Sequence, residues 1–329
     1  MIPIQVREKD KQALSVLKPA IETALYEAEV ELEIPKQYTG VRGFYDHNLK
    51  LNKLAYAAIE EFDLPLIRTW YKYGQYEPYE ELRPKQLEPH DHRFEDEAYV
   101  TSGQRTTIYL EDLIEFLLDL DLESIFEQEL FEFLISNYEE WDPAPYTDAY
   151  VASTRIIRVL EQLHFPEPDD ILASVGDLQS KFKDASIDLR YELKSIDQFD
   201  DEIHGHIAAF LRGLEDALRR IDETSSLEAE KKATLDKSRR VYHGYVWPWA
   251  ALTISINRAK GPTNRIEEFR ESGRSMLQTD KNDYETHLKG WTRELRESGL
   301  TVDLGATQSM DTPAPKAIRD LQRASLDNY

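Results

Sequence analysis

The chain has 329 residues, and its 63 acidic against 40 basic side chains give a formal net charge of -23. It contains no cysteine, which excludes disulfides, thiolate metal sites and a cysteine nucleophile. Hydrophobic residues make up 41% of the chain, enough for a packed core, and no stretch approaches the roughly 18 uncharged apolar residues of a membrane span. The N-terminus has no apolar signal-peptide region, so we expect a cytoplasmic protein with no membrane contact.

The charge is unevenly distributed along the chain. Residues 106–154 contain 13 acidic residues and no Lys or Arg, whereas residues 231–297 contain 14 basic and 9 acidic residues, a net charge of +5 (14 − 9). The overall negative charge repels nucleic-acid phosphates and disfavours a nucleic-acid partner. The acidic block fits a solvated face, a surface for a basic partner, or a contact with the basic third of the same chain.

Apolar residues spaced three and four apart predict helices over residues 8–33, 46–62 and about 66–73, the last of them ending at Gly74. Residues 76–100 are poor in apolar positions and are expected to be mostly loop. These segments predict a compact helical domain over residues 1–100.

An acidic helical segment is expected over residues 101–168, packed on the first domain. The apolar pattern over residues 108–138 predicts two helices joined near Asp121, and residues 147–163 form another. Pro166 and Pro168 end that helix and mark a domain boundary.

The region 169–299 is expected to form a bundle of long helices. A heptad seam predicts one long helix through residues 182–221, interrupted only by Ser186 and Asp200. The seam consists of Phe182, Leu189, Leu193, Ile196, Ile203, Ile207, Phe210, Leu214, Ala217 and Ile221. Residues 227–256 and 262–297 can fold back on it as an antiparallel bundle, although the seam equally permits a homodimer.

Within the bundle, Pro248 is expected to kink or break the second helix, and Gly261-Pro262 to form a turn. The tail over residues 300–329 is expected to hold one short helix, from Lys316 to Leu326. No convincing strand alternation occurs, so the sequence predicts an all-α fold.

Few motifs of catalytic chemistry are present. Phosphate-binding loops, nucleophile elbows and HExxH motifs are absent, and we expect no cofactor. His90 and His92 follow Pro89 in a predicted loop, where an extended backbone places both rings on one side. With nearby carboxylates they define one alternative, a metal-dependent helical hydrolase or nuclease, although no third fixed ligand accompanies them.

Two other groups of residues are candidates for partner binding. The first is an aromatic cluster whose composition is typical of protein interfaces and also of a helical core corner: Trp70, Tyr71, Tyr73, Tyr76 and Tyr79. The second is Arg239 and Arg240, which precede an aromatic stretch and can meet a partner or the chain's own acidic block. The same basic stretch defines another alternative, a structural coiled-coil or DNA-associated protein.

One stretch resembles a known family. Lys53-Leu54-Ala55-Tyr56 is followed by Leu64-Pro65-Leu66 and by Trp70-Tyr71-Lys72-Tyr73-Gly74, and the stretch extends to Leu82. It resembles the Panacea domain, also called the SocA-like antitoxin domain, over roughly residues 46–100. Gln75 stands where that family usually has proline.

The resemblance implies an all-α domain that neutralises a protein toxin by direct binding or acts as an adaptor, with no catalytic centre. It also implies that an additional segment supplies partner specificity, and here the long C-terminal region is available. We therefore expect a protein-binding module, with a cognate toxin as partner if the resemblance holds.

Overall fold

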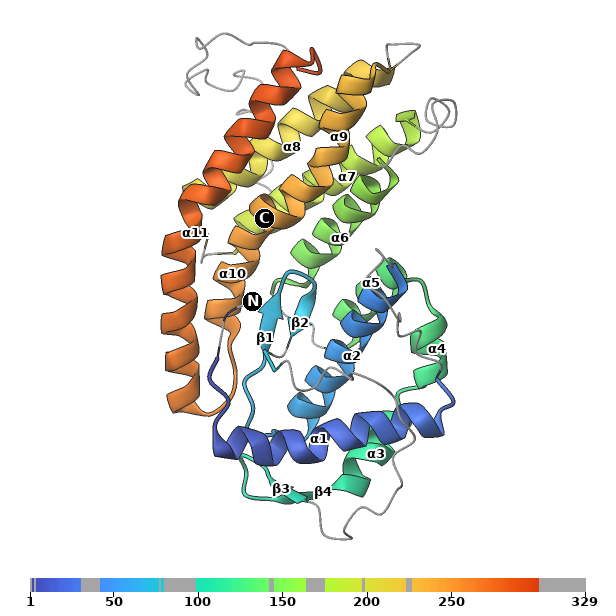
Figure 1. The fold of residues 1–329 in the computed structure, drawn as a ribbon, viewed down its shortest axis with the longest axis vertical. Helices are drawn as coiled ribbons and strands as arrows, with labels where there is room; N and C mark the ends of the chain where they lie inside the picture. Colours follow the sequence, from blue (N-terminus) through green and yellow to red (C-terminus); the bar gives the residue numbers. More distant parts are fainter. Residues whose placement is uncertain are drawn as a thin grey trace, which may run out of the picture.

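The computed structural model describes residues 2, 4–30, 42–76, 78–79, 99–141, 145–163, 175–196, 199–222 and 227–301, without the side chains of 42–46, 140, 141 and 222. Helices dominate this part of the chain (Figure 1). A group of N-terminal helices lies at one end, and a bundle of helices from the C-terminal half of the chain lies at the other. The all-α prediction is confirmed.

The N-terminal unit contains two helices and two short β-hairpins. Its elements are α1 (Glu8–Glu27), α2 (Arg42–Glu61), β1 (Thr69–Tyr71), β2 (Gly74–Tyr76), β3 (Tyr99–Thr101) and β4 (Thr107–Tyr109). The predicted apolar face of α1 is buried, because Leu14, Leu17, Ile21 and Leu25 recur at helical spacing and face the core.

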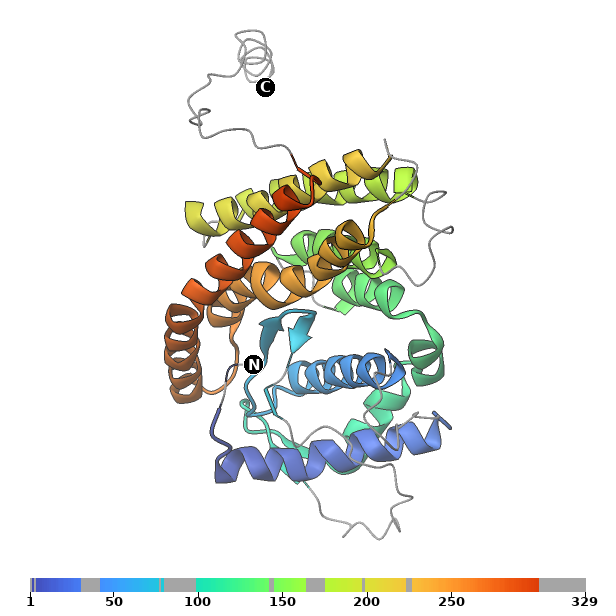
Figure 2. The ribbon, with the colours of Figure 1, turned by 45° about the horizontal axis from the view of Figure 1, so that its top comes forward.

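The helix predicted over residues 66–73 is wrong. Residues 69–76 form an antiparallel hairpin in which Thr69 pairs with Tyr76 and Tyr71 with Gly74. Trp, Tyr and Thr favour strands, and Gly74 has a φ of +78°, the left-handed conformation that a hairpin needs after its loop. Figures 1 and 2 show this hairpin between α2 and α10.

The acidic segment forms more helices than predicted and joins the two halves of the molecule. Its elements are α3 (Leu110–Leu118), α4 (Leu122–Glu127), α5 (Leu130–Trp141) and α6 (Thr147–Gln162). Asp121 lies at the first junction, as expected, and caps α4 by accepting from the Ser124 N–H. Helices α3 and α4 pack on α1 and α2, whereas α6 packs on α7 and α9.

The single long helix predicted through residues 182–221 is also wrong. The chain reverses between α7 (Val175–Lys194) and α8 (Asp201–Asp222), and the two helices pack together. Asp200, which interrupts the heptad seam, is exposed and caps α8 by accepting from the Ile203 N–H at 2.9 Å. All ten seam residues are buried within the chain's own bundle, so the intramolecular alternative holds and the seam offers no free face for a homodimer.

The remaining helices are α9 (Ala229–Val241), α10 (Trp247–Arg258) and α11 (Thr263–Glu297), with the π-helical turn η2 (Tyr242–Val246) between α9 and α10. Pro248 was expected to kink or break this stretch. The chain instead changes to π geometry just before it, with the Trp247 N–H bonded to the Tyr242 carbonyl, and Pro248 lies in the first turn of α10.

Helix α11 runs along both halves of the molecule (Figure 1). At its start, the buried Arg265 donates to Asp10 at 2.8 Å and to the Gln5 carbonyl at 2.6 Å. Further along, Trp291 stacks on Phe210 of α8, with ring centroids 4.7 Å apart. The buried apolar residues form one cluster from Ile2 to Leu300, so the predicted units share a continuous core.

Candidate functional site

The β1–β2 hairpin is fixed by an unusually close backbone approach. A Cβ atom on Gly74 would lie 2.2 Å from Cε1 of Tyr138 in α5. Only glycine allows both this contact and the positive φ at that position. The hairpin turn is therefore seated directly on the aromatic core.

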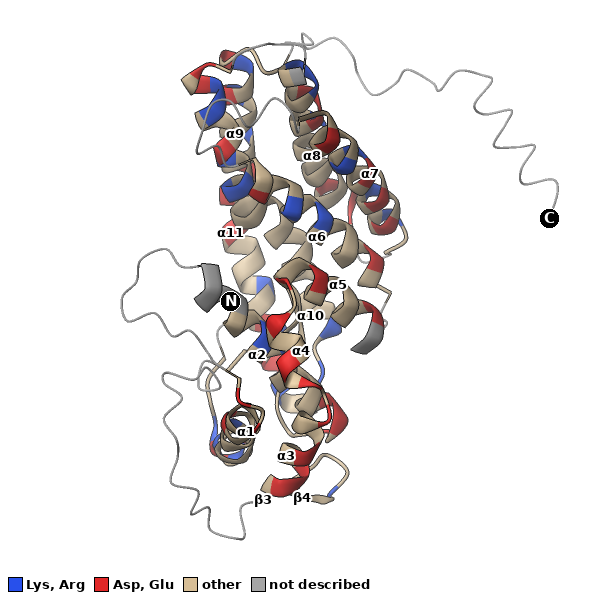
Figure 3. Cartoon of the chain, turned by 90° about the vertical axis from the view of Figure 1, so that its right-hand side faces the viewer, with Lys and Arg blue, Asp and Glu red and all other residues tan. Residues whose placement is uncertain are grey.

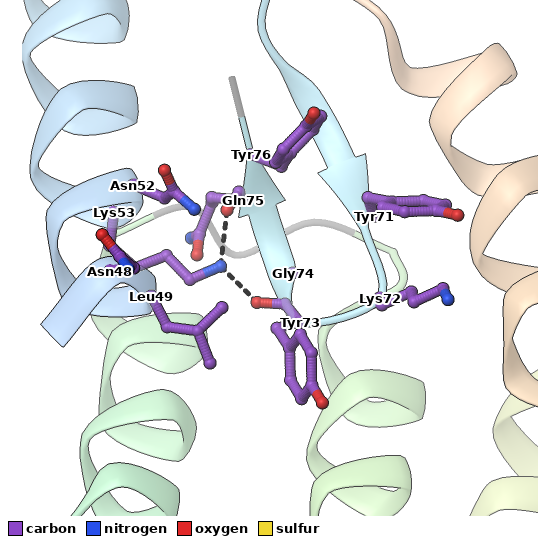
Figure 4. A pocket seen from close by; sticks show the side chains of 10 residues that line it. All are labelled: Asn48, Leu49, Asn52, Lys53, Tyr71, Lys72, Tyr73, Gly74, Gln75 and Tyr76. Atoms are coloured by element: carbon purple, nitrogen blue, oxygen red, sulfur yellow. Dashed lines mark hydrogen bonds between the residues drawn. The ribbon is translucent and has the colours of Figure 1, made fainter. Parts of the chain in front are cut away.

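A pocket lies between this hairpin and α2, with a cavity volume of about 310 Å³. We call it the hairpin pocket, and its lining consists of Asn48, Leu49, Asn52, Lys53, Tyr71, Lys72, Tyr73, Gly74, Gln75 and Tyr76. Figure 4 shows Asn52, Lys53 and Gln75 directed toward one another between α2 and β2, whereas Tyr71 and Lys72 extend to the opposite side of the hairpin.

Lys53 is the central polar group of the hairpin pocket. Its side chain is 1% exposed, and its amine donates to the carbonyls of Tyr73, in the hairpin loop, and Gln75, in β2 (Figure 4). The Nζ atom also lies 5.8 Å from the centre of the Tyr138 ring. Burial lowers the pKa of Lys53 well below the usual value for lysine, because the charged form loses its hydration.

A second buried polar group belongs to Gln75. Its Oε1 accepts a hydrogen bond from Nδ2 of Asn137 in α5, but its Nε2 has no hydrogen-bond partner among the described residues. A buried amide N–H without a partner is costly, so such groups are exceptions in folded proteins. Gln75 therefore has an unused donor at the α2 side of the hairpin.

The tip of the hairpin contacts the π-helical turn and the start of α10. The Trp247 indole donates to the Lys72 carbonyl at 2.8 Å, and the Tyr73 hydroxyl lies 3.2 Å from Nδ1 of His243. Burial lowers the pKa of His243 to about 4, against a smaller opposing effect of Glu161. Short π-helical segments often occur at functional sites, and this one places His243 against the tyrosine of the hairpin.

The opposite side of the hairpin faces α11. Burial raises the pKa of Tyr71 to about 12, and the Asp280 carboxylate adds to that effect. Burial lowers the pKa of Lys72, partly offset by Asp280. The ammonium of Lys72 lies 5.7 Å from the centre of the Tyr71 ring.

The structure divides the predicted aromatic cluster. Trp70 has no exposed surface and packs against Tyr138 and Tyr150, and Tyr79 is also buried, with its hydroxyl accepting from the Ile67 N–H. Tyr76 is 9% exposed, and Tyr71 and Tyr73 are half-buried. The buried members form a core corner, so only Tyr71 and Tyr73 have substantial exposed surface for a partner.

The two arginines lie apart from the hairpin pocket. Arg239 pairs with Glu161 of α6 at 2.8 Å, while Arg240 is exposed on α9. Other basic residues of the C-terminal region also pair with acids of the same molecule: Lys237 with Glu294, Lys260 with Glu60, Arg265 with Asp10, Arg270 with Glu267 and Lys289 with Glu285. Because these pairs neutralise much of the local positive charge, the structure gives no support to nucleic-acid binding.

His90 and His92 lie outside the described residues. Within the described ranges, no three His, Asp or Glu side chains gather where they can hold a metal ion. Across those ranges, no helix combines the length and apolar character needed to cross a membrane.

The sequence interpretation missed the role of Lys53 and of the amides around it. The available signal was the position of Lys50 and Lys53, three residues apart beside the apolar stripe of α2. Both side chains are buried, and Lys50 donates to the carbonyls of Phe126 and Gln128 at the end of α4. Lysines at such positions indicate buried amines with carbonyl partners rather than a solvated helix face.

Together these observations define an all-α protein with a polar-and-aromatic pocket at an inserted β-hairpin. The chain belongs to the family described as a domain of unknown function, DUF8098, whose profile matches residues 5–104 and 80–325. Neither the curated proteins nor the solved structures gave a match to this chain.

Proposed function

We propose that this chain is a cytoplasmic protein-binding module of the antitoxin or adaptor type, with the β1–β2 hairpin as its partner-binding element. The observation that carries the proposal is the rigid presentation of two half-buried tyrosines. The hairpin is fixed by Lys53 from α2 and by Trp247 from α10, while Tyr71 and Tyr73 stay partly exposed. Aromatic anchors that are already ordered lose little entropy on binding and often dominate interface energies.

The same contacts give physical meaning to the sequence resemblance. Lys53 belongs to the helical half of the Panacea-like motif, and Tyr73 to its aromatic half, and the Lys53 ammonium donates to the Tyr73 carbonyl. The two halves of the motif thus act as one structural unit. The antitoxin form of the proposal, in which the partner is a protein toxin, rests on the sequence resemblance alone.

The acidic segment is the second part of the proposed interface. Figure 3 shows acidic residues along α3, α4 and α5. The carboxylates of Glu111, Glu115, Asp119 and Glu123 are exposed, so they are available to mask a basic site on a partner. Substituting these four residues with lysine is expected to weaken binding, mainly by slowing association, and to change its salt dependence. Unchanged affinity would exclude the masking role.

Capture of a tagged chain from its native lysate, followed by mass spectrometry, tests the proposal. One stoichiometric protein that is lethal when expressed alone and harmless together with this chain is the expected result. The double variant Tyr71→Ala/Tyr73→Ala should then lose the partner and the protection. Tyr191→Ala is the matched control, because Tyr191 is 73% exposed on α7, away from the hairpin.

Two results would count against the proposal. A partner that binds the double variant as tightly as the native chain would exclude the hairpin as the interface. A partner that is not toxic would exclude the antitoxin form and leave the adaptor form.

A further inference from the structure

The hairpin pocket contains a buried amine, that of Lys53, with no carboxylate of the described residues beside it. The pKa of Lys53 is lowered by burial alone, and no carboxylate of the described residues forms an ion pair with its Nζ. The two bonds from Nζ go to backbone carbonyls, which leaves one of the three N–H donors of an ammonium group. A buried ammonium of this kind is stabilised by any anion that can reach it.

A second donor lies on the same side of the hairpin. Gln75 is 1% exposed, lines the pocket and has an Nε2 group without a partner among the described residues. Asn52 lines the pocket from α2, with its side chain directed toward Gln75 (Figure 4). The polar end of the pocket is therefore rich in donors, with Lys53 as its ionisable group, because the other lysine of the lining, Lys72, extends to the opposite side of the hairpin (Figure 4).

The remaining walls are apolar or aromatic. Leu49, Tyr73 and Tyr76 contribute to the lining, and the volume of about 310 Å³ is at the lower end of the range for ligand pockets. A ligand that matches these walls has a small organic body and one acceptor group with a single negative charge. A phosphate dianion would bring more negative charge than Lys53 neutralises.

We propose that the hairpin pocket binds a small organic monocarboxylate, with the carboxylate at Lys53 and Gln75 and the apolar body against Leu49 and the tyrosines. This inference goes beyond the proposed protein-binding function and does not depend on it, because the ligand binds to the chain without a protein partner. It also assigns a role to the unused donors of Lys53 and Gln75.

The test uses the full chain and three carboxylate probes: phenylacetate, benzoate and hexanoate. Ligand-observed NMR measures their dissociation constants, with phenylacetamide as the neutral counterpart of phenylacetate. We expect at least one carboxylate to bind, and phenylacetate to bind at least tenfold more tightly than phenylacetamide, because only the acid neutralises the buried ammonium. Equal binding of the acid and the amide, or binding of no carboxylate at 10 mM probe, roughly the weak limit of specific ligand affinity, would overturn the proposal.

Two variants test the position of the ligand. Gln75→Glu nearly preserves shape and places a competing carboxylate near Lys53, so phenylacetate binding should fall at least tenfold. Gln12→Glu makes the same chemical change on the exposed face of α1 and should leave binding unchanged. Asn52→Asp provides a second competing carboxylate if Gln75→Glu fails to fold, as judged by circular dichroism. Full phenylacetate affinity in a folded Gln75→Glu or Asn52→Asp variant would exclude this site.

Discussion

Two reversals of the chain, the β1–β2 hairpin and the turn between α7 and α8, are stabilised in different ways. The β1–β2 hairpin is held by polar groups from distant parts of the sequence: Lys53 on one side, and Trp247 and His243 on the other. The α7–α8 reversal is held by an apolar seam, with its ion pair Arg190–Glu215 at 3.6 Å on the outside. From this comparison we expect the stability of the first reversal to depend on protonation and on hydrogen-bond geometry, and that of the second to depend on buried apolar volume.

Alanine substitutions at one glycine of the hairpin and one glycine of α8 should give the largest difference in stability between the two regions. Gly74→Ala introduces a residue with positive φ and a Cβ that clashes with Tyr138, and we expect a loss of about 4 kcal/mol in the free energy of unfolding. Gly205→Ala in α8 meets no atom within 4 Å and should stabilise the chain by about 0.5–1 kcal/mol. Urea denaturation measures both, and a loss below about 1 kcal/mol for Gly74→Ala would show that the hairpin can shift away from Tyr138.

A cavity in the seam should have the next largest effect. Leu214 is fully buried in α8, so Leu214→Ala should reduce the free energy of unfolding by about 3 kcal/mol. The loss should be the same at pH 7 and pH 5, because the removed methyl groups do not titrate. Urea denaturation at both pH values is the measurement, and a marked pH dependence of the loss would show that titratable groups contribute to the seam.

The two reversals also show what the sequence can predict. The seam residues follow helical spacing, so their burial could be predicted. The break at Asp200 was not predicted, because the heptad spacing continues across it, although an aspartate at that position is a good N-cap. The hairpin could not be predicted in the same way. Its strands have three residues each, too few for a visible alternation, and its stability comes from Lys53 and Trp247, which lie far away in the sequence.

The candidate site was predictable only in part. The aromatic composition of residues 70–79 indicated an interface or a core corner. Burial in β1 does not alternate, because Thr69 and Trp70 are both buried and Tyr71 is half-buried, so the strand pattern alone does not identify the exposed tyrosine. The pocket itself depends on the distance between α2 and β2, and no pattern within a short stretch of the sequence determines that distance. The unused donor of Gln75 likewise depends on where Asn137 of α5 lies.

Mild acid should weaken the hairpin region through His243. The pKa of this histidine is about 4 in the folded chain, below its usual value of 6.5, so the unfolded chain binds more protons between these values. The contribution of the neutral His243 to the free energy of unfolding is therefore complete above pH 6.5 and decreases as the pH falls toward 4. Between pH 7 and pH 5 the loss from this group should be about 2 kcal/mol.

The variant His243→Asn isolates this effect. Asparagine can still bond to the Tyr73 hydroxyl but does not titrate, and the charges facing the site from other elements, on Glu161, Lys72 and Arg239, are retained. Urea denaturation should therefore show a loss between pH 7 and pH 5 that is about 2 kcal/mol smaller in the variant than in the native chain. Equal losses would indicate that His243 is hydrated in the folded state.

The smallest expected effect tests a single hydrogen bond at the hairpin tip. Tyr73→Phe removes the hydroxyl that lies 3.2 Å from Nδ1 of His243 and should cost about 1 kcal/mol of unfolding free energy. Tyr191→Phe is the matched change on α7. Tyr191 is 73% exposed, so we expect its hydroxyl to be hydrated in both states and the variant to show no measurable loss. If both variants are as stable as the native chain, the bond to His243 adds nothing to the stability of the tip. The hairpin would then be fixed mainly by Lys53 and Trp247, because both donate to backbone carbonyls that no side-chain substitution in the hairpin removes.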